Sequence, residues 1–265
     1  DITARLDRDF AFKAKGDWLQ QGQCPSCGKK ELYVHAEHPW VLRCGRMSKC
    51  GAEHHVKELY PDLFERWSER YQVTPEAPNA SADAYLRDGR GFDLEKIKGW
   101  YTQESYWDRQ KDIGSATVRF PLPGIGYWER IIDQPHRFGK RKATFNGNYG
   151  GTWWTPPGAD LLGNEIWIVE GIFDDIALLH HDITAAAALS CNNYPEKSLK
   201  AIAEACAKEG IKRPRLVWAL DGDKAGRGYA RKHVARSRDE GWEATAAQIP
   251  QTGKAKLDWN DMHQR

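Results

Sequence analysis

Apolar and polar positions change their spacing along the chain, and each change predicts a different kind of element. In the last hundred or so residues, short apolar runs alternate with longer amphipathic stretches. The apolar runs predict strands at 165–169, 183–189, 215–220 and 244–249, and the amphipathic stretches predict helices at 174–181, 196–209 and 226–240. Alternation of this kind is typical of an α/β fold with a parallel sheet and right-handed crossovers.

The pattern is different between residues 82 and 160. Apolar residues from Ala84 to Ile97 fit one buried helical stripe, which Gly89 and Gly91 interrupt. Residues 116–121 and 127–132 predict a strand pair around a turn rich in proline and glycine. We therefore expect an α+β subdomain at 82–160, followed by an α/β subdomain at 161–265.

The first seventy residues predict a separate domain. An amphipathic lead-in is followed by two short apolar runs, 32–34 and 40–42, that can form a hairpin, and then by a helix expected at 56–70. Residues 71–81 contain two prolines and several small polar residues, which is typical of a linker. The predicted boundaries are therefore 1–70 for the domain and 71–81 for the linker.

Composition narrows the class of protein. At 265 residues, with 40% hydrophobic and 29% charged residues, about two domains are expected. No apolar run approaches the roughly 18 residues needed to cross a bilayer, and no signal-peptide pattern is present, which favours a cytoplasmic protein. The chain begins at Asp1 rather than Met, so we expect a piece of a longer protein.

Charge is distributed unevenly although the net charge is only +2. The segment 130–142 carries one acid, Asp133, and five cations: Arg130, Arg137, Lys140, Arg141 and Lys142. Such a patch suits a polyanion such as nucleic acid, and an ordinary solvated face is the alternative.

Four of the six cysteines are clustered: Cys24, Cys27, Cys44 and Cys50. Thiolates at this spacing are typical of a structural zinc ion, whose closed tetrahedral shell leaves no open position for catalysis. His54 or His55 could replace one cysteine as the fourth ligand. The isolated Cys191 and Cys206 are expected to be small core residues.

Acidic residues follow two of the predicted strands. Glu170 comes directly after the strand at 165–169, with Asp174 one helical turn further on, and Asp221 and Asp223 follow the strand at 215–220. Because the carboxyl ends of parallel strands meet at one edge of a sheet, both groups should converge there. Carboxylate ligands favour Mg²⁺ or Mn²⁺, and two such ions can orient a triphosphate. For an isolated aspartate pair a solvated loop would be the alternative.

A further acidic element lies near the end of the chain, at 258–261. Asp258 could complete the metal site, and capping of a C-terminal helix is the alternative.

Together these motifs resemble a known family. Glu170-Gly171-Ile172-Phe173-Asp174 and Asp221-Gly222-Asp223-Lys224-Ala225-Gly226 resemble the two acidic motifs of the Toprim module. With four cysteines ahead of it, the chain resembles DnaG-type DNA primases, particularly their phage and mobile-element branch. The resemblance implies a Toprim-type parallel sheet with flanking helices, preceded by a basic α+β subdomain and an N-terminal zinc ribbon.

The resemblance also implies a function. A primase synthesises short RNA primers on a single-stranded DNA template from nucleoside triphosphates, with one structural Zn²⁺ and catalytic Mg²⁺ or Mn²⁺, and it can work with a replicative helicase that is fused or separate. The implied catalytic residues are Glu170, Asp221 and Asp223, with Asp174 and Asp258 as further metal ligands. The expected contacts to nucleic acid or nucleotide are Arg119, Arg137, Lys140, Arg141, Lys142 and Asn146.

Two other functions remain open at this point. A non-catalytic recombination mediator also joins zinc and Toprim elements and only binds DNA, and a Toprim nuclease would degrade it. The pair Trp153-Trp154 is a candidate platform for stacking bases, with burial in the core as the alternative.

Overall fold

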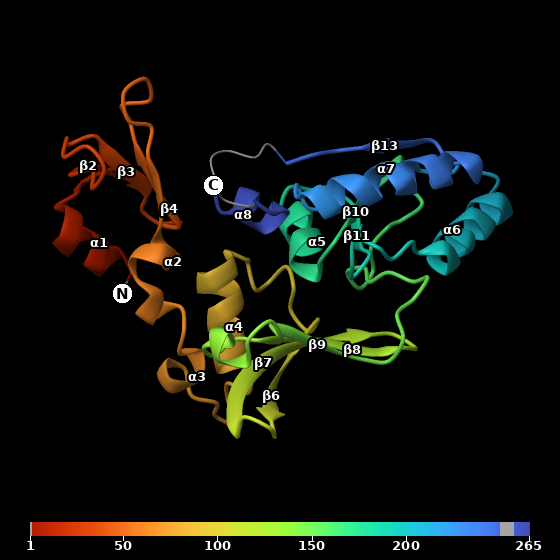
Figure 1. The fold of residues 1–265 in the computed structure, drawn as a ribbon, viewed down its shortest axis with the longest axis horizontal. Coiled ribbons are helices and arrows are strands. Elements are labelled where there is room, and N and C mark those ends of the chain that lie inside the picture. Colours follow the sequence, from red (N-terminus) through yellow and green to blue (C-terminus); the bar gives the residue numbers. More distant parts are fainter. Residues whose placement is uncertain (1, 250–256) are drawn as a thin grey trace.

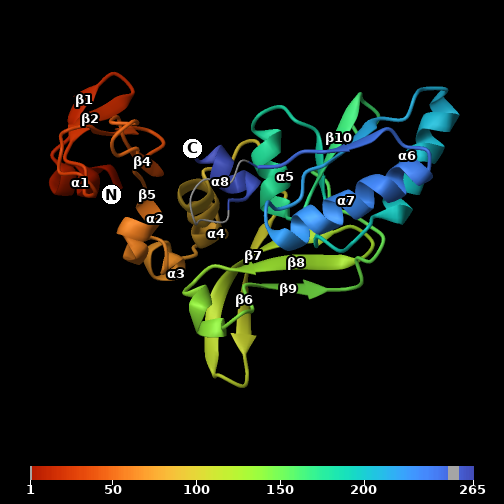
Figure 2. The same ribbon diagram turned by 45° about the horizontal axis from the view of Figure 1, so that its top comes forward.

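The computed structural model describes residues 2–249 and 257–265, in which the chain forms three sheets. The sheets follow one another along the sequence and lie in three neighbouring parts of the molecule (Figures 1 and 2). No helix in the described part of the chain is long and apolar enough to cross a membrane.

The amino-terminal module, residues 2–70, is built on an antiparallel sheet whose strands follow in chain order. Its elements are α1 (Ile2–Phe10), β1 (Lys13–Lys15), β2 (Trp18–Gly22), β3 (Leu32–His35), β4 (Val41–Cys44) and β5 (Glu53–His55). Leu6 of α1 packs with Leu32 and Leu42 of the sheet, and all three side chains are fully buried. The predicted hairpin is confirmed as β3 and β4.

The single helix predicted at 56–70 is wrong. The segment forms α2 (Val56–Leu59), a 3-10 turn (Pro61–Leu63) and α3 (Trp67–Arg70). Pro61 ends the first piece because proline has no N–H to donate and its ring clashes with the preceding helical turn. Trp67 fixes α3, since its side chain is buried beside Tyr71 and Tyr85.

The central sheet is antiparallel and also runs in chain order: β6 (Thr102–Asp108), β7 (Ile113–Leu122), β8 (Gly126–Ile131) and β9 (Ala143–Asn146). The predicted strand pair is confirmed as β7 and β8, whereas β6 and β9 were not predicted. Ahead of this sheet, α4 (Ala80–Ala84) continues into a π-helical turn, Tyr85–Gly89. Ser81 there donates a hydrogen bond to the Tyr71 carbonyl at 2.7 Å, so the end of the expected linker is packed.

The parallel sheet has the order β11-β10-β12-β13. Its strands are β10 (Glu165–Val169), β11 (Ala185–Ala187), β12 (Arg215–Trp218) and β13 (Ala244–Ala246), and its helices are α5 (Ile172–Leu179), α6 (Glu196–Glu209), α7 (Lys224–Asp239) and α8 (Trp259–His263). The predicted α/β alternation and parallel pairing are confirmed, although three of the four strands are shorter than expected.

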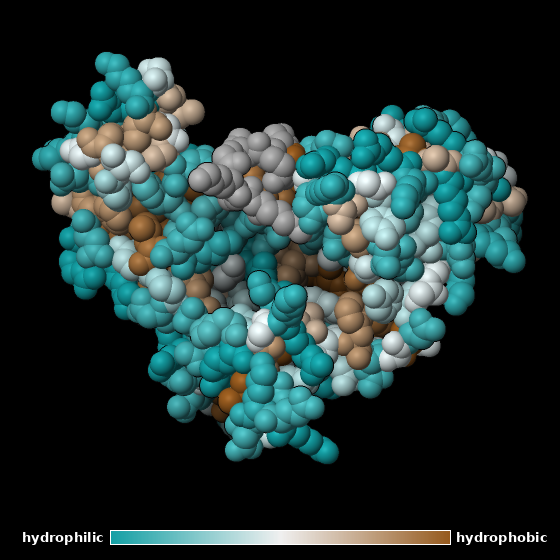
Figure 3. All heavy atoms as spheres, viewed as in Figure 1, coloured by the Kyte–Doolittle hydropathy of each residue, from teal (hydrophilic) through white to brown (hydrophobic). Residues whose placement is uncertain are grey.

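The central and parallel sheets share one hydrophobic core. Phe173 of α5 packs edge-on against Trp128 of β8 and Phe120 of β7, with ring centroids 5.2 and 6.1 Å away. Trp154 is 3% exposed within the same core, and Trp153 is half-buried, so the pair does not form an exposed stacking platform. Figure 3 shows the surface hollowed between these two parts, with hydrophobic residues inside the hollow.

Candidate active site

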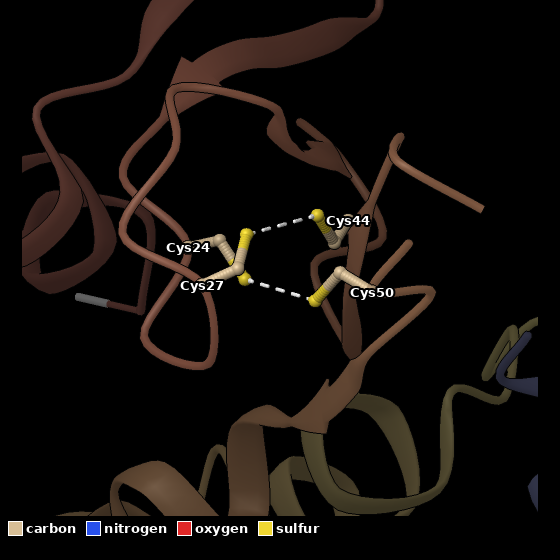
Figure 4. A group of neighbouring side chains, drawn as sticks. All are labelled: Cys24, Cys27, Cys44 and Cys50. Carbon is tan, nitrogen blue, oxygen red and sulfur yellow. Dashed lines mark hydrogen bonds between the residues drawn. The ribbon is translucent and has the colours of Figure 1, made fainter. Parts of the chain in front are cut away.

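Two loops of the amino-terminal module bring the four clustered cysteines together. Cys24 and Cys27 lie on the turn after β2, where Gly28 adopts a positive φ of 68°. Opposite them, Cys44 ends β4 and Cys50 lies in the loop that follows (Figure 4). The Sγ atoms of Cys27 and Cys44 are 3.8 Å apart, and those of Cys24 and Cys50 are 3.9 Å apart. All four sulfurs lie within 4.8 Å of one another.

These distances fit a single zinc ion. Four Zn–S bonds of about 2.3 Å at tetrahedral angles place the sulfurs about 3.8 Å apart. A hydrogen bond from the backbone at Lys29 lowers the pKa of Cys27 to about 7, because it stabilises the thiolate that binds metal. His54 lies 3.3 Å from the Ser26 hydroxyl, and neither His54 nor His55 belongs to the cluster. The four-cysteine cluster can therefore hold one zinc ion.

The two remaining cysteines lie in the part built on the parallel sheet. Cys206 of α6 is buried, as expected for a core residue. Cys191 is only half-buried. Burial raises the pKa of its thiol, and the charges of Glu170, Asp223 and Asp221 raise it further, so this thiol lies close to the acidic residues.

The acidic residues after β10 and β12 lie at the carboxyl ends of neighbouring parallel strands, as predicted. Gly171 separates Glu170 from α5, and Asp223 is the N-cap of α7, where its side chain accepts a hydrogen bond from the Gly226 amide at 2.8 Å. The loop closes tightly at Gly226, because a Cβ there would lie 2.1 Å from the Asp221 carbonyl oxygen. A side chain at this position would therefore displace the Asp221 backbone.

Asp174 joins α5 to the last helix, α8. It is 7% exposed, and its side chain accepts hydrogen bonds from the backbone amides of Gly171 at 3.2 Å and Trp259 at 3.0 Å. Burial raises the pKa of Asp174 well above its usual value, and the charges of Asp258 and Asp221 raise it further. Asp174, Asp221 and Asp258, from three separate segments of the chain, therefore lie close enough to repel one another.

Asp258 is the N-cap of α8 and accepts a hydrogen bond from the Asp261 amide at 2.7 Å. The capping alternative is therefore correct for its side chain. Burial raises the pKa of Asp258, followed by the charge of Asp261, while the Arg90 guanidinium lowers it. The same carboxylate thus caps a helix and lies beside the other acidic residues.

We call the group formed by Glu170, Asp174, Asp221, Asp223 and Asp258 the acidic edge. A divalent cation fits it on chemical grounds. The donor set is all oxygen, which Mg²⁺ and Mn²⁺ prefer, and a cation would offset the repulsion that raises the pKa of Asp174. The carboxylates do not form a closed ligand shell. Within 2–249 and 257–265, the four cysteines are the one group of three or more side chains that lie close enough together to hold an ion. A cation bound there would therefore need ligands in addition to these carboxylates.

Two half-buried arginines, Arg90 and Arg130, face these carboxylates, and the expected site did not include them. Arg90 follows the π-helical turn and donates to the Tyr85 hydroxyl from Nε at 2.9 Å, and it donates to the Asn260 side chain at 3.0 Å. Arg130 of β8 lies on the face of the central sheet that packs toward the parallel sheet. Its Nε is buried without a hydrogen-bond partner among the described residues. Burial alone would raise the pKa of Tyr85, but the charges of Arg90 and Arg130 lower it.

A sequence signal existed for only one of these arginines. Arg90 stands between Gly89 and Gly91, where these glycines interrupt an apolar stripe, a position where a cation is unusual. Arg130 was counted in the basic segment 130–142. Its side chain points inward, unlike the exposed cations of that segment, because of the register of β8, which the sequence does not reveal.

The expected nucleic-acid contacts lie elsewhere on the central part. Lys140 and Lys142 are exposed. Arg137 donates to the Gly114 carbonyl at 3.1 Å, and Arg141 donates to the Tyr106 hydroxyl at 2.6 Å. Arg137 and Arg141 therefore contact the hairpin of β6 and β7, and the exposed Lys140 and Lys142 are the sequence neighbours of Arg141.

Arg119 and Asn146 lie on the face of the central sheet that points away from the shared core. Arg119 is paired with Glu129 at 3.1 Å and lies over the ring of Tyr127 at 3.9 Å. Asn146 is exposed at the end of β9. The structure therefore brings the acidic residues together and leaves the predicted cations in two separate groups.

Comparison with known proteins gives one match in sequence and several in structure. The family described as Toprim-like matches residues 167–263. No curated protein matches the chain in sequence.

Three solved structures are similar in part. The zinc-binding and RNA polymerase domains of the Aquifex aeolicus primase share 15% identity at a TM-score of 0.48, over 99% of this chain and 79% of that one. The RNA polymerase domain of Mycobacterium tuberculosis primase DnaG shares 18% at 0.45, over 78% and 70%. The primase fragment of the bacteriophage T7 primase-helicase protein shares 15% at 0.31, over 93% and 94%.

The sequence match covers the part of the chain in which the acidic edge lies. Both strand-end motifs and Asp258 fall within residues 167–263. The order of parallel strands and helices over this range agrees with the α/β fold expected from the same motifs. Residues 167–263, here called the Toprim-like domain, are therefore similar to the Toprim-like family in sequence.

Proposed function

We propose that the chain is a DNA primase, a nucleotidyltransferase that synthesises short RNA primers on a single-stranded DNA template. The observation that carries this proposal is the position of the acidic edge, which faces two half-buried arginines, Arg90 after the π-helical turn and Arg130 of the central sheet. Carboxylates that can hold cations, opposite guanidinium groups that can hold phosphates, are what transfer of a nucleotidyl group requires.

In this proposal Glu170, Asp221 and Asp223 hold the catalytic metal, and Asp174 and Asp258 support it. Mg²⁺ or Mn²⁺ bound there supplies charge neutralisation for the phosphates of the incoming nucleotide. The protein contributes position. Asp223 is fixed by the Gly226 amide, and Asp174 is fixed by amides from two elements.

Arg90 and Arg130 are proposed to bind phosphate groups of the nucleotide or the template. A guanidinium group forms strong, directional hydrogen bonds to phosphate oxygens. The buried Nε of Arg130, which has no partner among the described residues, supports this role because such a group is costly to leave unpaired.

The exposed cations around the hairpin of β6 and β7 are proposed to follow the template backbone. They are Arg137, Lys140, Arg141 and Lys142, with Arg119 and Asn146 as further contacts on the outer face of the sheet. Single-stranded nucleic acid is bound in this way by grooves or surfaces of positive charge. Nucleoside triphosphates, single-stranded DNA and a replicative helicase, fused or separate, are the proposed partners.

One structural zinc is proposed for the four-cysteine cluster. Its closed shell stabilises the amino-terminal module and takes no part in the reaction. We further propose that the module at 1–70 and the segment at 71–81 precede a polymerase core at 82–265, and that the protein acts in the cytoplasm.

The test is incubation of the protein with single-stranded DNA of varied sequence, labelled ribonucleotides and Mg²⁺ or Mn²⁺. Short labelled RNA whose formation depends on the template supports the proposal. Shortening of the DNA under the same conditions would identify a Toprim nuclease instead. Binding of DNA with neither reaction, on every template and with either metal, would favour a recombination mediator.

A further inference from the structure

Helix α8 is shared between the acidic edge and the amino-terminal module. Figures 1 and 2 both show it lying between α5 and that module, close to the end of the chain. It is a short helix of five residues and begins at the N-cap Asp258, one of the proposed metal ligands. Its position therefore depends on what holds it from either side.

The amino-terminal module holds one side of α8 by charged groups. Lys57 of α2 pairs with the Asp261 carboxylate at 3.1 Å. Arg43 of β4 donates to the Arg265 carbonyl at 2.6 Å, and the Arg265 guanidinium pairs with Glu53 of β5 at 2.7 Å. Three elements of the module thus contact the last five residues of the chain.

The other side of α8 is hydrogen-bonded to residues at the acidic edge and to Arg90. The backbone amide of Trp259 donates to Asp174 at 3.0 Å, and the Trp259 indole donates to the Ala219 carbonyl, two residues before Asp221, at 2.7 Å. The side chain of Asn260 donates to the Arg90 carbonyl at 2.9 Å. These bonds connect α8 to α5, to the loop after β12 and to the residue after the π-helical turn, all three of which carry residues of the proposed site.

Asp261 connects the two sides. Its Oδ1 accepts from Lys57, and its Oδ2 accepts from the backbone amide of Asp258 at 3.3 Å. In return its own amide donates to the Asp258 carboxylate at 2.7 Å. A displacement of Asp261 would therefore move both the backbone and the side chain of Asp258.

We propose that Lys57 of the amino-terminal module is a positioning residue for Asp258, acting through Asp261, so that the acidic edge is complete only when the module is docked on α8. The inference rests on the proposed metal site. It makes the module a structural part of that site, because Lys57 contacts Asp261, which in turn holds Asp258.

The test uses Lys57→Met in the full chain and measures Mn²⁺ binding by electron paramagnetic resonance, without nucleotide or template. Methionine is unbranched and one atom shorter than lysine, and it removes the charge. If Lys57 acted only through its charge, its removal would tighten Mn²⁺ binding, because a cation near the site repels the metal. A positioning role predicts the opposite, a Mn²⁺ affinity about three- to tenfold weaker than that of the wild type. Loss of a residue that holds a metal ligand in place typically lowers metal affinity by about tenfold or more.

Two variants control the experiment. Lys57→Arg keeps the charge and should restore binding to within about twofold of wild type, since an arginine at this position can still reach Asp261. Lys212→Met removes a surface ion pair with the same 3.1 Å distance, that between Lys212 and Glu243. This pair joins the segment before β12 to the residue before β13 and does not involve α8. It should leave Mn²⁺ binding unchanged.

Hydrogen exchange of the α8 amides provides a second readout that needs no metal. Lys57→Met should speed exchange at the Asp261 and Met262 amides, and Lys212→Met should not. Unchanged or tighter Mn²⁺ binding in Lys57→Met, or unchanged exchange in α8, would overturn the inference while leaving the proposed function intact. Absence of Mn²⁺ binding in the wild type would instead count against the metal site of the proposed function, and the exchange measurement would still decide the role of Lys57.

Discussion

At the scale of single residues, Asp223 combines a structural and a proposed catalytic role. Its side chain caps α7 by accepting the Gly226 amide, and its carboxylate belongs to the acidic edge. Asparagine is as good an N-cap as aspartate but carries no charge. One substitution can therefore remove the proposed metal ligand and keep the helix.

We expect Asp223→Asn to lower dinucleotide synthesis by at least about 100-fold, the scale on which loss of one electrostatic contributor slows an enzyme. Template binding and the unfolding midpoint should stay near wild type. Primer synthesis with labelled ribonucleotides measures the effect, and Glu170→Gln is the companion variant. Wild-type rates in both variants would rule out the metal assignment.

His263 links pH to stability at the contact between α8 and the rest of the chain. Its Nε2 lies 2.8 Å from the Gly91 carbonyl and so carries the proton, while Nδ1 faces His181 at 3.2 Å and the ring of His180 lies beside it. Burial lowers the pKa of His263 to about 4, and the neighbouring histidines contribute to the shift. The neutral form is therefore the native one at pH 7.

In the unfolded chain a histidine titrates near pH 6.5. Because the folded pKa is lower, the stability that neutral His263 provides is complete above about pH 6.5 and is lost as the pH falls toward 4. We expect the free energy of unfolding to fall less between pH 7 and pH 5 in His263→Gln than in wild type, as measured by urea denaturation. Equal losses in the two proteins would contradict this assignment.

At the scale of elements, the amino-terminal module depends on the four-cysteine cluster. The core of the module is small and includes Cys24 and Cys44 themselves. A module of this size gains much of its folding free energy from metal binding. The central and parallel sheets share a separate core that contains none of the four cysteines.

Cys27→Ser should therefore release zinc and unfold residues 20–55, while the two other sheets stay folded. Elemental analysis measures the metal, and hydrogen exchange resolved along the chain measures the folding. The matched control is Cys206→Ser, which replaces a buried cysteine outside the cluster. This variant protein should keep the zinc ion in the four-cysteine cluster. Absence of zinc from the intact wild-type protein would disprove the prediction.

The exposed cations around the hairpin of β6 and β7 form the second element with a testable role. Lys140→Ala together with Lys142→Ala should weaken binding of single-stranded DNA about equally for all sequences. The slope of log K against log salt should become shallower by about 0.7 for each phosphate that these lysines neutralise in the wild type. Fluorescence anisotropy at several salt concentrations measures both quantities.

The control for this experiment is Lys200→Ala together with Lys208→Ala, which removes two exposed cations from α6. It should leave the slope unchanged. An unchanged slope in the Lys140 and Lys142 variant would assign the patch to ordinary solvated surface.

At the scale of the whole molecule, the arrangement of the module against the rest of the chain depends on the close approach of Trp40 to Gly91. Gly91 has a φ of +77°, and a Cβ built there would lie 2.9 Å from the Trp40 ring. Trp40 also lies 6.3 Å, ring to ring, from His263 of α8. Trp40 of the module therefore lies against Gly91 on one side and against α8 on the other.

Gly91→Ala should displace Trp40 and loosen the module, which small-angle X-ray scattering would detect as a larger radius of gyration with an unchanged zinc content. Gly99→Ala is a matched control, because Gly99 has a φ of +79° but nothing within 4 Å of its Cβ position. Both variants bear the strain of a left-handed alanine, about 1–2 kcal/mol. Equal scattering from the two variants would show that Trp40 does not hold the module in place.

The sequence alone determined the features that depend on local spacing. The alternation of strands and helices after residue 160, the parallel pairing and the clustering of four cysteines all follow from short-range patterns, and the structure confirms them. The carboxylates after β10 and β12 could be placed at one edge because connection rules for parallel strands leave few alternatives. Local chemistry also explains the one long helix that was wrong, since Pro61 breaks it.

Only the tertiary structure decided which distant residues meet. Arg130 lies opposite Asp258 because the register of β8 turns it toward the parallel sheet, whereas Arg119, one of the residues expected to bind nucleotide, points to the other face of that sheet and pairs with Glu129. The contact between Lys57 and Asp261 joins positions 204 residues apart. A pattern read along the chain carries periodicity but not the packing of one sheet against another. Such pairings arise only when a shared core fixes the relative position of the sheets.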